Sequence, residues 1–440
     1  MKRAFILLTL GAIGIGAFAH HASAQREALY LTRRSAVPLP RYVPGEIVVQ
    51  FAIAASQSAV EHALRDVGGV DARKSDTGGY YVLRLADGAD EDAAVARLRG
   101  MPEVSWVERN GVARALLSPN DEFYRYQWNM KLIGAERTWD IQKGDPSVVV
   151  AVIDTGIAYE DFGPFRKAPD WGNTQFVTGF NVLTRSEHAN DDNFHGTHVA
   201  STIAEATDNT TGVAGLCFQC ALMPVKALNA AGSGSFVGIA EGIDYATNFM
   251  QNGRRVVKVI NLSLGGEAES QAVREAITRA VTAGIVVVAA AGNENSGVLF
   301  PASLPNVIAV GAVDGRKQRA SYSNYGPQLD VVAPGGDVDR DDDSDGVPDG
   351  VLQQTFSPSA AQRGIFTQFN YFFVDGTSQA TPHVAALAAL LIRQGITEPA
   401  AVQKAIEQSA EDLGPAGRDD EYGHGLIRPA KALEGLGVNR

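Results

Sequence analysis

The first part of the chain, from residue 45 to residue 112, alternates short apolar runs with amphipathic stretches. The runs "GEIVVQF", "YYVLRL" and "EVSWVERN" predict β-strands, and the stretches "SAVEHALRDVGG" and "EDAAVARLRG" predict helices. In the first of these helices Val60, Ala63, Leu64 and Val67 share one face, and glycine ends it. The order strand, helix, strands, helix, strand predicts a small α+β unit.

After residue 118 the pattern changes to near-continuous apolar runs that end in glycine or a polar residue. These runs are "SVVVAVIDTG", "VVKVINLSLGG", "GIVVVAAAGN" and "NVIAVGAV". Helix-like segments such as "SFVGIAEGIDYATNFM" and "SQAVREAITRAVTAG" lie between them. Apolar strands that alternate with helices predict an α/β fold, a mostly parallel sheet with helices on both faces. Ligands in such sheets bind beyond the carboxyl ends of the strands, so we expect the chemistry there.

Four polar residues stand where that chemistry is expected. Asp154 and Asn293 each follow an apolar run, His195 precedes a helix in "HGTHVASTIAEA", and Ser378 precedes a long apolar helix in "GTSQATPHVAALAALLI". Each alone has an ordinary structural explanation, such as a turn, a packed histidine or a helix cap. Asp154, His195 and Ser378 supply an acid, a base and a hydroxyl that we expect at one rim of one sheet, which is the set that activates a serine nucleophile.

The segments around these residues resemble the subtilisin-like serine proteases, or subtilases. "AVIDTG", "HGTHVA", "AAAGN" and "GTSQATPHVA" match the four signature blocks of that family in the family's order. The resemblance extends from about Trp128 to Leu433. It implies a subtilisin-like catalytic domain, for which we expect the bounds 119–440.

The resemblance also implies the role of each residue. Ser378 would be the nucleophile, His195 its general base and Asp154 the carboxylate that orients the imidazole. The Asn293 side chain and the Ser378 backbone N–H would bind the oxyanion. The expected reaction is hydrolysis of peptide bonds through an acyl-enzyme, with broad specificity and no catalytic cofactor.

The same resemblance implies that substrate binds as an extended strand between two chain segments. Their residues would be Gly232, Ser233, Gly234, Ser263, Leu264, Gly265 and Gly266. Main-chain pairing of this kind tolerates many substrate sequences, which suits a digestive protease acting on proteins and peptides.

The chain also departs from the family pattern. Gln379 stands where the family commonly has Met, and Ala386 and Ser201 stand where it commonly has Gly. A stretch from about Gly335 to Tyr371 is interpreted as a lengthened loop. None of these departures removes a catalytic group.

The N-terminus carries targeting signals. Residues 1–24 combine a basic start, an apolar run and the small residues Ala22 to Ala24, which predict a secretory signal peptide cleaved after Ala24. A membrane anchor is the alternative, but the run is short for a span. We therefore expect a protein that is exported to the periplasm or the medium and is free of the membrane after cleavage.

Residues 25–118 are predicted to be a propeptide. The polar, proline-rich residues 25–44 predict a linker, and residues 45–112 resemble the inhibitory, ferredoxin-like propeptide of the family through "VPGEIVVQF" and "EVSWVERN". Cleavage by the enzyme itself is expected within "GVARALLSPND". The released propeptide would act as an inhibitor of the catalytic domain.

Net charge bears on the class of binding partner, and cysteine content bears on the redox state of the compartment. Lys and Arg total 38 against 50 Asp and Glu, a net charge of -12 that argues against nucleic acid as the main partner. The only cysteines are Cys217 and Cys220. A local disulfide is expected in an oxidising compartment, and two free, buried thiols are the alternative. We expect a monomer.

An acidic run between residues 337 and 349 holds seven aspartates. Its spacing resembles a calcium loop, with glycine at the sixth position. The candidate ligands are Asp341, Asp343, Asp345, the carbonyl of Val347, and Asp349. Leu352 stands where such a loop has its final glutamate, so a full helix–loop–helix site is not expected. A solvated acidic loop is the alternative.

Two other functions fit less well. An esterase of the α/β-hydrolase type needs its triad in the order Ser, acid, His, and this chain has the opposite order. A catalytically inactive binding protein would be expected to have lost a triad residue, and all three are present.

Overall fold

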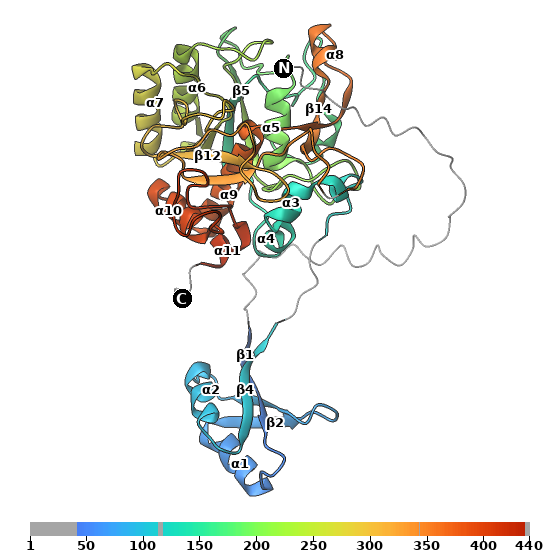
Figure 1. The fold of residues 1–440 in the computed structure, drawn as a ribbon, viewed down its shortest axis with the longest axis vertical. Helices are drawn as coiled ribbons and strands as arrows, with labels where there is room; N and C mark the ends of the chain where they lie inside the picture. Colours follow the sequence, from blue (N-terminus) through green and yellow to red (C-terminus); the bar gives the residue numbers. More distant parts are fainter. Residues whose placement is uncertain (1–41, 113–117, 343, 436–440) are drawn as a thin grey trace, which may run out of the picture. The chain divides into compact units, whose positions relative to one another are not determined.

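The computed structural model describes residues 42–112, 118–342 and 344–435 (Figure 1). The predicted signal peptide, residues 25–41 of the linker, part of the expected maturation segment and the candidate ligand Asp343 lie outside the described residues. The chain divides into two compact units, one with the described residues up to 112 and one with those from 118 onward. No helix in the described ranges is long and apolar enough to cross a bilayer.

The N-terminal unit is a four-stranded antiparallel sheet with two helices. The strand order is β2-β3-β1-β4. The elements are β1 (Tyr42–Phe51), α1 (Gln57–Asp66), β2 (Gly69–Lys74), β3 (Tyr81–Leu85), α2 (Glu91–Arg99) and β4 (Val104–Gly111). Val60 and Leu64 of α1 and Leu98 of α2 pack on Ile47 and Leu83 of the sheet. The predicted α+β unit is confirmed, but the predicted linker is too long, because β1 begins at Tyr42.

The second unit is built on a seven-stranded sheet with the strand order β13-β12-β11-β10-β5-β7-β6. All its neighbouring strands pair in parallel. The strands are β5 (Val149–Asp154), β6 (Phe180–Asn181), β7 (Ala221–Lys226), β10 (Val257–Leu262), β11 (Val286–Ala290), β12 (Val307–Val313) and β13 (Val331–Pro334). The predicted parallel α/β fold is therefore confirmed.

Alternate residues of each central strand face two separate cores. Val150 and Val152 of β5 pack in the core that holds α5 (His195–Ala204) and α9 (Thr377–Gln394). Ala151 and Ile153 pack on the opposite face, where α6 (Phe236–Asn248) and α7 (Gln271–Thr282) lie side by side (Figure 1). Burial on both faces explains why the strands lack the alternation of apolar and polar residues.

Shorter helices complete the α9 side of the sheet. They are α3 (Trp128–Leu132), α4 (Ala135–Ile141), α10 (Pro399–Ser409) and α11 (Pro429–Glu434). Two 3₁₀ turns, Tyr124–Tyr126 and Pro169–Trp171, and a small hairpin of β8 (Met250–Gln251) and β9 (Arg254–Arg255) lie in the connections. Helix α9 is buried at Thr377 and from Gln379 to Ile392, so Ser378 is the partly exposed residue at its start.

The stretch interpreted as a lengthened loop is not a loop throughout. It contains an antiparallel hairpin of β14 (Val351–Phe356) and β15 (Phe369–Val374), with α8 (Pro358–Gln362) between the strands. Every residue of β14 is buried, and β14 contacts α5 (Figure 1). The prediction failed because the glutamines and threonine of "VLQQTF" are polar, and only the fold shows that they are buried against a helix.

Cys217 and Cys220 are both buried and lie just before β7. Their sulfur atoms are joined in a disulfide, 1.97 Å apart. Gly144 covers the pair, with a φ of +100° and a site for Cβ only 2.6 Å from the Cys217 sulfur. Only glycine fits that position, because a side chain would collide with the sulfurs.

Candidate active site

Asp154 and His195 are joined at the carboxyl end of β5. The Asp154 side chain is fully buried, and its Oδ1 accepts hydrogen bonds from Thr155 N at 2.6 Å and His195 Nδ1 at 2.8 Å. A carboxylate only accepts, so the proton of the neutral imidazole is on Nδ1 and Nε2 is the free base. His195 is partly exposed and lines a cleft. The pair can therefore take up a proton from a group in that cleft.

The surroundings of His195 act on its pKa in opposite directions. Burial lowers the pKa, because it disfavours the charged imidazolium. The negative charge and hydrogen bond of Asp154 raise it, and Asp191 adds to the same effect. The balance leaves the pKa of His195 above its ordinary value.

Asp191 organises the turn before His195, and the sequence analysis did not identify it. Its carboxylate is buried and accepts five hydrogen bonds. The donors are Thr155 Oγ1 (2.9 Å), Asn193 N (2.9 Å), Phe194 N (3.1 Å), Thr197 N (3.0 Å) and Thr197 Oγ1 (2.6 Å). These bonds tie the end of β5 to the first turn of α5. The available signal was an acid four residues before His195 in "DDNFHGTHVA".

Two reciprocal hydrogen bonds with Ser263 hold Ser378 at the start of α9. Pro382 has no N–H, so the carbonyl of Ser378 lacks the helical bond that residue 382 would donate. Ser263 Oγ donates to that carbonyl at 2.8 Å, and Ser378 Oγ donates to the Ser263 carbonyl at 3.1 Å. Ser263 lines the same cleft as His195. The hydroxyl of Ser378 is therefore placed at the edge of this cleft.

Asn293 and the Ser378 N–H converge beside Gly376. Oδ1 of Asn293 accepts from Thr377 N at 2.8 Å and Thr377 Oγ1 at 2.9 Å, which leaves Nδ2 as the available donor. A Cβ on Gly376 would lie 3.5 Å from that Nδ2 and 3.7 Å from Ser378 N. Gly376 has a φ of +148° and a neighbouring Gln379 oxygen 2.8 Å from the same point, so it must be glycine. Two N–H donors beside one small space can bind an anionic oxygen.

The cleft has a volume of about 590 Å³. Its lining includes all seven predicted substrate-binding residues, Gly232, Ser233, Gly234, Ser263, Leu264, Gly265 and Gly266. Leu228, Phe236 and Ile239 add an apolar wall. The structure thus brings the two predicted segments to the same space as His195.

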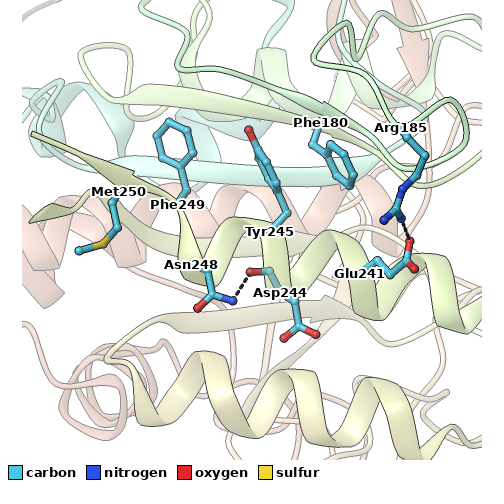
Figure 2. A pocket seen from close by; sticks show the side chains of 8 residues that line it. All are labelled: Phe180, Arg185, Glu241, Asp244, Tyr245, Asn248, Phe249 and Met250. Atoms are coloured by element: carbon cyan, nitrogen blue, oxygen red, sulfur yellow. Dashed lines mark hydrogen bonds and ion pairs between the residues drawn. The ribbon is translucent and has the colours of Figure 1, made fainter. Parts of the chain in front are cut away.

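A second hollow, of about 520 Å³, lies between α6 and the segment around Phe180 (Figure 2). Phe180 stacks on Tyr245, and Phe249 lies near Tyr245 with ring centroids 5.9 Å apart. Its two acids, Glu241 and Asp244, are paired with Arg185 and Arg279 respectively. The lining holds no histidine, serine or cysteine, so this hollow lacks a hydroxyl and imidazole pair like Ser378 and His195.

His198 and His383 are buried and serve packing. Burial lowers the pKa of His198 to about 3 and that of His383 to about 4, so both are neutral near pH 7. His198 Nε2 lies 3.1 Å from two carbonyls of the β14–β15 hairpin. His383 Nε2 lies 2.9 Å from Asn129 Nδ2. These bonds fix α5 and α9 within the core.

Among the described calcium candidates, Asp341, Asp345 and Val347 lie in one hydrogen-bonded turn. Asp341 accepts from the backbone N–H groups of Asp345 at 3.1 Å and Gly346 at 3.2 Å, and Asp345 accepts from Val347 N at 3.0 Å. Asp349 is buried and bonds to Asp342 N. Within the described ranges, which leave out Asp343, no three His, Cys, Asp or Glu side chains gather as a metal site.

A separate buried acidic cluster lies at the C-terminal end of α5. Burial raises the pKa of Asp170 to about 7 and that of Glu205 well above its ordinary value. Gln354 links them, because it donates to Glu205 Oε1 and accepts from Asp170 N, both at 2.8 Å. Asn209 Nδ2 also donates to Asp170 Oδ1 at 2.9 Å. Its members are far apart in the chain, so the sequence analysis did not find it.

Comparison with protein families gives two matches. Residues 145–425 match the subtilase family, and residues 33–110 match the fervidolysin N-terminal prodomain. The first match includes Asp154, His195, Asn293 and Ser378, and the second includes the whole described α+β unit up to residue 110.

Individual relatives agree with these matches. A thermophilic serine proteinase of Bacillus sp. (strain AK1) is 36% identical over 386 residues, covering 87% of this chain and 86% of the relative. Subtilisin DY of Bacillus licheniformis is 37% identical over 313 residues, covering 70% of this chain and 98% of the relative. A solved protease structure from Pseudoalteromonas arctica PAMC 21717 has a TM-score of 0.61 and 30% identity, covering 72% and 99% of the two chains. The chain therefore belongs to the subtilase family of serine proteases and carries an N-terminal prodomain.

Proposed function

We propose that this chain is a secreted endopeptidase of broad specificity that cleaves peptide bonds with the triad Asp154, His195 and Ser378. The observation that carries the proposal is the hydrogen bond from His195 Nδ1 to the buried Asp154, which leaves Nε2 as a base at the edge of the cleft. The chemistry needs no cofactor.

In the first step Ser378 Oγ leaves the Ser263 carbonyl and donates to His195 Nε2. The imidazole takes the proton as Oγ attacks the substrate carbonyl carbon, and Asp154 stabilises the imidazolium. His195 then gives the proton to the departing amine, and the C–N bond breaks. The product is an ester of Ser378, which water hydrolyses by the same steps with His195 again as the base.

The carbonyl oxygen of the substrate becomes an anion during both attacks. Asn293 Nδ2 and Ser378 N lie beside one space and would donate to that oxygen. The Ser378 N–H is at the first turn of α9, where it is not used in the helix and where the helix dipole favours negative charge.

Substrate would bind along the segments 232–234 and 263–266. Within the described residues, Leu264 and Gly265 make no backbone hydrogen bond to another segment, so their N–H and C=O groups can pair with an added strand. Such pairing does not select side chains. The apolar wall of Leu228, Phe236 and Ile239 favours an apolar substrate residue without requiring one.

We further propose that the protein is made as a zymogen and exported. Residues 1–24 would direct secretion, and residues 25–118 would be removed by the enzyme itself and act as its inhibitor. The match of residues 33–110 to a prodomain supports this order of events. The Cys217–Cys220 disulfide suits an oxidising compartment. All proposed catalytic groups come from one chain, so a monomer suffices.

The acidic loop is proposed to bind a structural calcium ion. Its donors are all oxygens, which calcium prefers. Bonds from backbone N–H groups to the carboxylates of Asp341 and Asp345 close the turn. Asp341, Asp343, Asp345, the Val347 carbonyl and Asp349 would hold the ion. The ion would offset the repulsion between these aspartates.

Replacement of Ser378 tests the nucleophile and maturation together. Ser378→Ala should lose peptidase activity, and its precursor should accumulate uncut in a protease-free host. A phosphonylating reagent should label Ser378 in the parent protein, as located by peptide mass spectrometry. The matched control is Ser409→Ala, which removes a buried hydroxyl bonded to Ile406 away from the cleft and should mature normally. Normal maturation of Ser378→Ala would rule out self-processing.

Replacement of Asn293 tests the oxyanion site. Asn293→Ala should lower kcat by roughly 10²–10³ with little change in KM, because the lost donor acts on charge that develops in the transition state. This range is carried over from subtilisin, a relative in the same family. The control Asn248→Ala removes an amide that bonds only within α6 on the rim of the second hollow, and it should leave kcat unchanged. A change in KM alone would contradict the assignment.

The pH dependence of kcat/KM tests His195. The base must be neutral, so activity falls as the pH drops through the pKa of His195. Since this pKa is raised, the midpoint should lie above the ordinary value of about 6.5. Asp154→Asn removes the raising charge and leaves the effect of burial, so the midpoint should move to lower pH. The same variant should lose about 10⁴ in kcat. An unchanged midpoint would show that Asp154 does not act on His195.

Thermal unfolding tests the calcium proposal. In an inactive Ser378→Ala background, calcium should raise Tm relative to a chelator, by roughly 5 °C at a hundredfold excess over Kd. Asp343→Ala/Asp345→Ala in that background should abolish the shift, as measured by calorimetry. A calcium-dependent shift of equal size in both proteins would place the ion elsewhere and leave this run as a solvated loop.

A further inference from the structure

The backbone directly before His195 is strained. Phe194 has φ of 112° and ψ of −29°, outside the regions that L-residues ordinarily adopt. It precedes the first residue of α5, so its conformation sets the direction in which His195 leaves the turn. Such a backbone persists only where its surroundings hold it.

Hydrogen bonds hold both the N–H and the carbonyl of Phe194. The N–H of Phe194 donates to Asp191 Oδ1 at 3.1 Å. Its carbonyl accepts from His198 N at 3.2 Å, within α5, and from Thr355 Oγ1 at 2.7 Å. The Thr355 bond is the shortest of the three and comes from β14, which is separated from Phe194 by 161 positions in the chain.

The hairpin that carries Thr355 is firmly attached to α5. His198 Nε2 lies 3.1 Å from the carbonyls of Val351 and Phe372, one on each strand of the hairpin. Ser201 Oγ donates to the Gln354 carbonyl at 3.2 Å. Thr355 itself is fully buried. These contacts fix the hydroxyl of Thr355 relative to the helix that begins with His195.

We propose that Thr355 is a positioning residue for His195, which it controls through the carbonyl of Phe194. Its hydroxyl holds the strained peptide so that Nδ1 of His195 meets Asp154 and Nε2 faces Ser378. The inference rests on the proposed function of His195 as the general base. The proposal gives the β14–β15 hairpin, which lies in the lengthened part of the chain, the task of positioning the general base.

The first test measures kinetics. Thr355→Val replaces the hydroxyl with a methyl group of similar size. We expect kcat, normalised to the number of active sites titrated with a phosphonate, to fall roughly 10-fold to 100-fold. KM should change less than about twofold. Thr355→Ser keeps the hydroxyl and should restore most of the rate. Thr247→Val is the matched control, since Thr247 is buried and its Oγ1 donates to the Ile243 carbonyl at 2.7 Å in α6. An unaltered kcat in Thr355→Val, or an equal loss in Thr355→Ser, overturns the proposal.

The second test does not depend on activity. In a Ser378→Ala background, proton NMR should detect the Nδ1 proton of His195 bonded to Asp154. Thr355→Val should shift or broaden this resonance, and Thr355→Ser and Thr247→Val should not. Where Thr355→Val does not fold, Thr355→Ala serves instead. A resonance that Thr355→Val leaves unchanged overturns the positioning role. If Thr355→Val shifts the resonance but the protein with Ser378 intact has no peptidase activity, the positioning role stands and only the proposed function is rejected.

Discussion

The hydrogen bond between His195 and the buried carboxylate of Asp154 is the interaction on which the rest of the site depends. A carboxylate that is fully removed from water is costly unless its charge is compensated by donors. Here Thr155 N and His195 Nδ1 share one of its oxygens. Asp191 accepts hydrogen bonds from Thr155 Oγ1 and Thr197 N and so keeps the segments that carry these two donors in place. The sheet supplies the rigid base, because Asp154 is the last residue of a strand buried on both faces.

In the segment around Ser378, a side chain likewise compensates for a missing hydrogen bond. Pro382 removes one helical bond from α9, and Ser263 replaces it with its hydroxyl. Ser263, which directly follows β10, is thereby bonded to the first turn of α9, where Ser378 lies. Asn293, after β11, is tied to the same helix start through Thr377. Three neighbouring strands, β5, β10 and β11, therefore each place a contact at one edge of the sheet.

The β14–β15 hairpin connects a second part of the chain to this edge. It begins two residues after Asp349, at the end of the acidic loop. Its contacts with the α5 region involve His198, Ser201 and Thr355. The neutral state of His198 follows from burial, and it allows one ring nitrogen to face two carbonyls without placing a charge in the core. The acidic loop thus leads directly into the hairpin, and the hairpin packs against the helix that begins with His195.

The sequence by itself determined the fold class and the candidate residues. Continuous apolar runs that alternate with helices indicate parallel strands buried on both faces, and a polar residue at the end of such a strand is expected at the carboxyl edge of the sheet. This is why Asp154 and Asn293 could be placed in advance, and why His195 and Ser378 fitted beside them. The tertiary structure alone decided the contact of Thr355 with the Phe194 carbonyl, the two hydrogen bonds between Ser263 and Ser378, and the direction of the His195 pKa shift. These depend on contacts between residues 161, 115 and 41 positions apart in the chain, and a pattern read along the sequence carries no information on such distances.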